Sequence, residues 1–133
     1  MGIKKLVKTP QHKKRILFVE DDKSIREVTT LFLEAEGFLV HCASNGQEAL
    51  DYLETHDLPA LILLNLKMPV MDGFQFSEKM QQNPKIANIP VVITSGADSY
   101  FAPTYLARTH ARAYLQRPPS LEALLATVRR YCS

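Results

Sequence analysis

Polar and charged side chains stand at or just after the ends of short apolar runs in this chain, where they could act together chemically. The set comprises Glu20, Asp21, Asn65, Ser95 and Arg117. Carboxylates supply the hard oxygen ligands that Mg²⁺ requires, and a guanidinium is a planar fork of donors, whereas a carboxamide is a very poor nucleophile. An acidic cluster alone is more often a solvated loop or the charged start of a helix. Ligands of open α/β sheets bind beyond the carboxyl ends of the strands, so the shared position of these residues predicts one site.

Three unbroken apolar runs have the length of β-strands. They cover residues 16–19, 60–64 and 90–94. Continuous rather than alternating hydrophobicity suits strands that are buried on both faces, as in a parallel sheet. Two weaker runs, at 39–43 and 113–115, are expected nearer the sheet edges.

Helical patterns lie between these runs. The residues that mark expected helix starts or ends are Gly37, Asn45, Gly73 and Ser120. A further helix over 102–109 contains Pro103, which is tolerated only in the first turn, and residues 96–101 before it are expected to form a long loop. Strands and helices alternate throughout, which predicts an α/β fold with a doubly wound parallel sheet and helices on both faces.

Length, composition and charge fit one folded domain with a short basic arm. The chain has 133 residues, of which 46% are hydrophobic. It has no apolar run of membrane length, and no signal peptide is expected. Residues 1–14 hold five lysines and no acid, whereas residues 15–133 hold 11 basic and 14 acidic residues. Such an arm is more often a solvated terminus than a contact for nucleic acid, and the folded part is not basic enough to predict DNA binding. The two cysteines make no disulfide framework, which favours a cytoplasmic protein.

Five motifs in order resemble the receiver domains of two-component response regulators. They are Glu20-Asp21, the segment from Leu61 to Phe74 around Asn65, the Met68-Pro69 and Asp72-Gly73 pairs within it, Thr94-Ser95-Gly96, and Tyr114-Leu-Gln-Arg-Pro118. The resemblance covers residues 15–133. It implies a flavodoxin-like (βα)5 fold with strand order 2-1-3-4-5, and no effector domain is expected after the last helix.

The resemblance implies a role for each site residue, with two departures from the family pattern. Asn65 stands at the position of the phospho-accepting Asp, and Arg117 at that of the Lys that pairs with the phosphoryl group. Glu20, Asp21 and the backbone carbonyl of Lys67 match the Mg²⁺ ligands, here with weakened affinity expected. Ser95 matches the hydroxyl that binds a phosphoryl oxygen, and Tyr114 the aromatic that rotates on activation, although a turn serine and a packed aromatic are ordinary alternatives.

Two backbone features also follow from the resemblance. The Arg117–Pro118 bond is expected to be cis. His110 falls where receivers usually have Gly, so its backbone is expected to be strained or rearranged.

We therefore expect a pseudo-receiver, a signalling module that acts by protein–protein interaction without Asp phosphorylation and is not an enzyme. Its partner would be a histidine kinase or a downstream target, with neither nucleic acid nor membrane involved. Arg112 and Ala113 stand where receivers that dimerise carry acids, which predicts a monomer or weak dimer. One alternative is a phospho-accepting receiver whose acceptor is blocked by substitution. The other is a binder of small ligands at the strand-end crevice, which no Gly-rich phosphate loop supports. The scattered histidines show no triad order or metal spacing.

Overall fold

The computed structural model describes residues 13–96 and 101–132 of the chain. Within them, strands and helices alternate as β1 (Arg15–Val19), α2 (Lys23–Ala35), β2 (Leu39–Ala43), α3 (Gly46–Thr55), β3 (Leu61–Leu64), α4 (Gly73–Gln81), β4 (Val91–Ser95), α5 (Ala102–Thr109), β5 (Ala113–Gln116) and α6 (Leu121–Tyr131). The helix predicted over 102–109 has those bounds. The strand predicted at 90–94 covers Val91–Ser95 in the structure. It starts after Pro90, which has no N–H to contribute to a ladder. Most of the predicted basic arm and residues 97–100 of the predicted loop lie outside the described residues.

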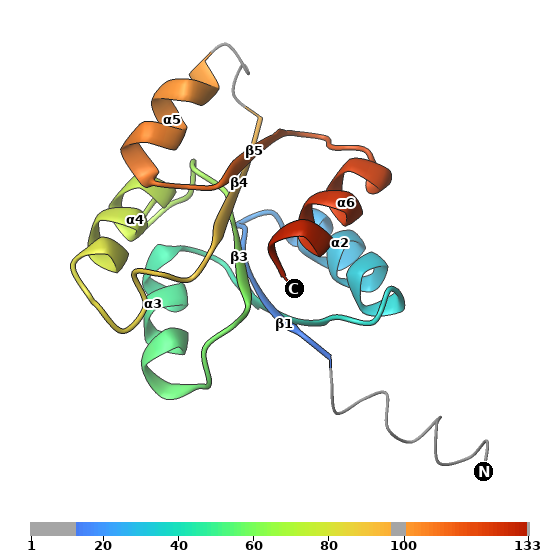
Figure 1. Cartoon of the computed structure of the whole chain (residues 1–133), viewed down its shortest axis with the longest axis horizontal. Helices are drawn as coiled ribbons and strands as arrows, with labels where there is room; N and C mark the ends of the chain where they lie inside the picture. Colours follow the sequence, from blue (N-terminus) through green and yellow to red (C-terminus); the bar gives the residue numbers. More distant parts are fainter. Residues whose placement is uncertain (1–12, 97–100, 133) are drawn as a thin grey trace.

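The strands form one parallel sheet in the order β2-β1-β3-β4-β5. Helices α3, α4 and α5 lie on one face of this sheet, and α2 and α6 on the other (Figure 1). The flavodoxin-like fold is therefore confirmed, as is the expectation that the two weaker runs form the edge strands. None of the described helices combines the length and hydropathy of a membrane-spanning segment.

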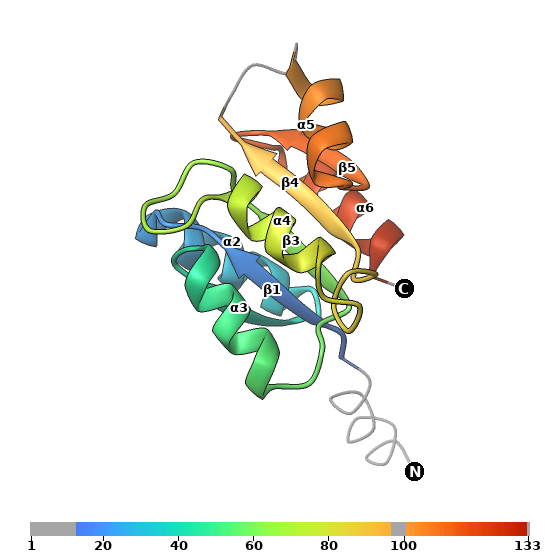
Figure 2. The ribbon, with the colours of Figure 1, turned by 90° about the vertical axis from the view of Figure 1, so that its left-hand side faces the viewer.

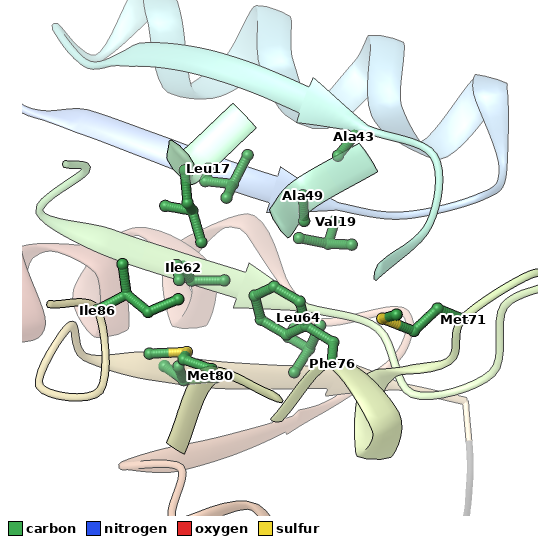
Figure 3. Close-up of a cluster of buried hydrophobic side chains, with 12 residues drawn as sticks. Leu17, Val19, Ala43, Ala49, Ile62, Leu64, Met71, Phe76, Met80 and Ile86 are labelled. Carbon is green, nitrogen blue, oxygen red and sulfur yellow. The ribbon is translucent and has the colours of Figure 1, made fainter. Parts of the chain in front are cut away.

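Two apolar clusters explain why the central strands are continuously hydrophobic. Leu17, Ile62 and Leu64 join the cluster beneath α3 and α4, which Figure 3 shows together with Phe76 and Met80. The alternate strand residues join a second cluster, beneath α2 and α6. Because helices cover both faces, every position of β3 is buried, and no alternation of apolar and polar residues remains.

Among the described helices, four begin with a side-chain cap at the carboxyl edge of the sheet. The capping residues, each of which accepts the N–H three residues later, are Asp22, Asn45, Asp72 and Ser120. The predicted caps Asn45 and Ser120 are thereby confirmed, and Gly37, with φ of 99°, follows the last turn of α2. These caps satisfy N–H groups that a helix leaves unpaired, and they hold the loops around the predicted site.

Among the described residues, two that are not glycine have a positive φ. His110, at φ 59°, ends α5 in the left-handed conformation, so the predicted unusual backbone is confirmed. Its N–H donates to the Leu106 carbonyl at 2.8 Å. Val70, at φ 69°, was not predicted to be unusual. The Met71 N–H bonds the Pro69 carbonyl at 2.8 Å across it, the pattern of a strained γ-turn. The Val70 side chain is 80% exposed.

Candidate functional site

The predicted site residues meet at the carboxyl edge of the sheet. In β1 and β3, Val19 pairs with Leu64, so Glu20 and Asn65 leave neighbouring strands at the same level. The Asn65 N–H bonds the Val19 carbonyl at 2.9 Å, and the Arg117 N–H bonds the Ser95 carbonyl at 2.8 Å. The sheet register therefore brings together side chains that are far apart in sequence.

The side-chain amide of Asn65 lies among three oxygen atoms. Its Nδ2 is 2.9 Å from the Lys67 carbonyl oxygen, 3.2 Å from Asp21 Oδ1 and 3.3 Å from Glu20 Oε2. Asn65 is 2% exposed and Glu20 is fully buried. Two amide hydrogens are shared among three acceptors, so this nitrogen joins the two carboxylates to the β3–α4 loop.

Arg117 forms an ion pair with Glu20. Arg117 Nη1 donates to Glu20 Oε1 at 2.6 Å, and the Arg117 side chain is 24% exposed. The guanidinium therefore turns toward the buried carboxylate of Glu20. The Arg117–Pro118 peptide bond is cis, as predicted.

The electrostatics of Glu20 reflect its burial and its partners. Burial raises the pKa of the Glu20 carboxyl above its ordinary value, while the Asp22 N–H, and then the charge of Arg117, act in the lowering direction. The Asp22 N–H donates to Glu20 Oε2 at 3.1 Å. Both Glu20 oxygens therefore have donors, which a buried carboxylate requires.

Arg26 supports this site, and sequence reasoning did not find it. Its Nη1 donates to the Glu20 carbonyl at 2.8 Å and to the Asp21 carbonyl at 2.9 Å, which fixes the loop between β1 and α2. No sequence signal distinguished Arg26 from an ordinary helix arginine, because the contact depends on how α2 packs against the sheet.

The crowding around Gly73 explains why glycine follows Asp72 in this chain. A Cβ atom at Gly73 would lie 2.5 Å from the Asn65 carbonyl oxygen and 2.9 Å from the Leu66 Cα. The Gly73 N–H also bonds the Leu66 carbonyl at 2.9 Å. Only glycine lets α4 begin this close to the strand end that carries Asn65.

The structure also gives the positions of the other predicted site residues, which are Ser95, Tyr114 and Lys67. Ser95 is buried at the end of β4, at 2% exposure. The half-buried ring of Tyr114 lies 6.1 Å from that of Tyr105 on α5. Lys67 contributes its carbonyl to Asn65, while its side chain is exposed.

Comparison with known proteins places the chain in a family. The model of the response regulator receiver domain matches residues 16–129. The chain belongs to this family of two-component signalling domains. This receiver domain is 36% identical over 115 residues to the response regulator Rre1 of Synechocystis, covering 86% of this chain and 49% of that protein. It therefore spans about half the length of this curated relative.

Solved structures agree with the family. A putative response regulator from Chloroflexus aurantiacus matches with a TM-score of 0.82 and 26% identity, over 90% of this chain and 98% of the other. TrrA from Thermotoga maritima, solved in complex with Mg(2+)-BeF, has the same fold, with a TM-score of 0.77 at 24% identity over 89% of this chain and 98% of TrrA.

Proposed function

We propose that this receiver domain is a pseudo-receiver, in which Asn65 occupies the phospho-acceptor position. It would signal through protein–protein contacts without Asp phosphorylation. The main support for this proposal is that Asn65 Nδ2 contacts Glu20, Asp21 and the Lys67 carbonyl. A carboxamide is a very poor nucleophile and has no comparably stable phosphorylated form.

The same contacts argue against tight Mg²⁺ binding. Within the described ranges, no group of three or more His, Cys, Asp or Glu side chains is arranged to hold a metal ion. The oxygens of Glu20, Asp21 and Lys67 that would ligate Mg²⁺ already accept bonds from an amide, and the Arg117 charge opposes a second cation. Mg²⁺ prefers several unengaged oxygen ligands in octahedral geometry. We therefore propose that this site binds Mg²⁺ only weakly.

Arg117 binds the Glu20 oxygen that Asn65 does not contact. At 2.6 Å its guanidinium is bound to Glu20, and in this proposal it takes the place of the Lys that would face a phosphoryl group. Ser95 and Tyr114 are the proposed switch residues, whose positions a partner would bias in place of a phosphoryl group.

The wider role follows from the family. Response regulators act with histidine kinases and downstream targets, and we propose such a protein as the partner of this non-enzymatic domain, in the cytoplasm. We assign the domain to residues 15–133, with 1–14 as a basic arm that does not bind nucleic acid. We expect a monomer or a weak dimer.

The test is phosphorylation with acetyl phosphate and Mg²⁺, followed by intact-mass measurement. Wild type should gain no phosphoryl group. Asn65→Asp should gain one poorly, because Arg117 still competes for Glu20, and the Asn65→Asp/Arg117→Lys pair should gain it more fully. Asn88→Asp, which adds a carboxylate at an exposed loop position, is the matched control and should stay unmodified.

Two results would count against the pseudo-receiver. Phosphorylation of wild type at another residue would show that the pocket still performs the transfer. Equal phosphorylation of the single and double variants would make Arg117 a tolerated substitute, and would favour an ordinary receiver with a blocked acceptor.

A further inference from the structure

A groove separate from the strand-end site lies between α3 and α4. Its volume is about 870 Å³. Residues of α3 line one side, and Lys79 of α4 with the turn after α4 lines the other. Figure 2 shows the two helices side by side on one face of the sheet. Cavities that bind small molecules in proteins measure roughly 300–1,000 Å³, so this groove has the size of a ligand site.

The groove has an aliphatic floor. Leu50, Leu53, Leu58 and Ile86 line it. Leu53 and Ile86 are each 5% exposed and also belong to the core cluster beneath α3 and α4, whereas Leu58 is 48% exposed. The floor is therefore anchored in the core, and it offers apolar surface that an occupant could remove from water.

The charges around the groove are asymmetric. Lys79 and Lys85 line the α4 side, and Glu54 is the acidic residue among the groove-lining residues. In the part of the chain that the structure describes, neither lysine lies within ion-pairing distance of a carboxylate. Two ammonium groups thus border an apolar floor, and neither is paired with a described carboxylate.

We propose that this groove binds an amphipathic organic anion of metabolite size. Its aliphatic or aromatic body would cover Leu58, and its carboxylate would lie between Lys79 and Lys85. The size favours a small molecule over a partner's helix. A helix about 10–12 Å across fills roughly 500 Å³ per turn, so the groove would hold fewer than two turns. This inference does not depend on the proposed function.

The test is an NMR titration of the ¹⁵N-labelled full chain with decanoate, kept below its micellar concentration, and with 2-naphthoate. Saturable shifts are expected in amides of residues 47–58 and 79–86, and not around Asn65. The Lys79→Gln/Lys85→Gln double variant should weaken binding at least tenfold, and Leu58→Gln should weaken it as well. Lys23→Gln, on α2 at the opposite face, is the matched control and should bind like wild type.

The charge preference supplies a second criterion. Decyltrimethylammonium, which has the same chain length and a positive head, should bind at least tenfold more weakly than decanoate. The proposal is overturned if neither anion gives saturable shifts in this groove, if the cation binds equally well, or if the double variant binds as wild type while retaining a native spectrum. Binding of an acidic peptide but of neither anion would also overturn it, in favour of a protein partner.

Discussion

The charged side chains of the strand-end site and those of the α3–α4 groove differ in their partners. In the strand-end site, Arg117 binds Glu20 at 2.6 Å, and Asn65 joins Glu20 and Asp21. In the groove, Lys79 and Lys85 border aliphatic side chains, with no ion pair among the described residues. In the first region the buried Glu20 carboxylate has partners within the protein, whereas in the second the lysine side chains face solvent.

This difference predicts that the strand-end site contributes to folding stability, whereas the groove lysines contribute to ligand binding. A buried charge needs a partner, so removing one member of the strand-end network leaves the other unpaired at a cost in folding free energy. An exposed lysine contributes little to folding and is available for an external anion. Substitutions in the two regions should therefore affect different measurements, in the order of size given below.

The largest expected effect is that of Gly73→Ala. The added Cβ would meet backbone atoms of Asn65 and Leu66 at 2.5 and 2.9 Å, so α4 or the β3 end must shift, at about 3 kcal/mol of unfolding free energy. Urea denaturation measures the loss. Gly96→Ala is the control, because the nearest atom to its new Cβ would be Arg117 Nη2 at 3.8 Å. A loss at Gly73 no larger than that at Gly96 would mean that the site loop yields easily.

The next effect is that of Arg117→Ala. It leaves the buried Glu20 carboxylate without its ion pair, and we expect a loss of about 2 kcal/mol, below the range for fully buried pairs because Arg117 is partly exposed. Thermal and urea unfolding both report it. Arg129→Ala breaks the exposed pair with Glu36, at 3.2 Å, and should cost at most about 1 kcal/mol. Equal losses would remove the distinction between the buried and the exposed pair.

A gain in stability is expected for Val70→Asn. Val70 has φ of 69° and is 80% exposed, so asparagine, which tolerates the left-handed region, should relieve about 1 kcal/mol of strain and lose little burial. The melting temperature should rise. Val28→Asn, at a 63% exposed position within α2, should not raise it. An unchanged or lower melting temperature for Val70→Asn would show that the turn is unstrained.

The smallest effect is that of Lys79→Gln. Because Lys79 forms no ion pair with any of the described residues, the unfolding free energy of this variant should stay within about 0.5 kcal/mol of wild type. The same variant is expected to weaken anion binding in the groove. A loss of more than 1 kcal/mol in denaturation would place Lys79 in a folding interaction, and the contrast between the two regions would fail.

The amino-acid sequence alone determined the fold and the edge of the sheet where the site lies. Continuous apolar runs at 16–19 and 60–64 require burial on both faces, and caps such as Asn45 and Ser120 are local contacts over three residues. These features depend on short-range chemistry, so they can be inferred without coordinates, whereas the strand order 2-1-3-4-5 was implied by the resemblance to receiver domains. The edge strands were likewise predictable from their weaker hydrophobicity.

Only the tertiary structure decided which partners the site residues have. Arg117 and Glu20 are 97 positions apart, and the choice of Glu20 over Asp21 depends on rotamers and on the depth of each carboxylate. The contacts of Asn65 Nδ2, the support from Arg26 and the positive φ of Val70 likewise arise when loops from different strands are packed against one another. The α3–α4 groove also depends on the tertiary structure, because its floor and its lysines come from separate segments whose spacing is set by the packed core.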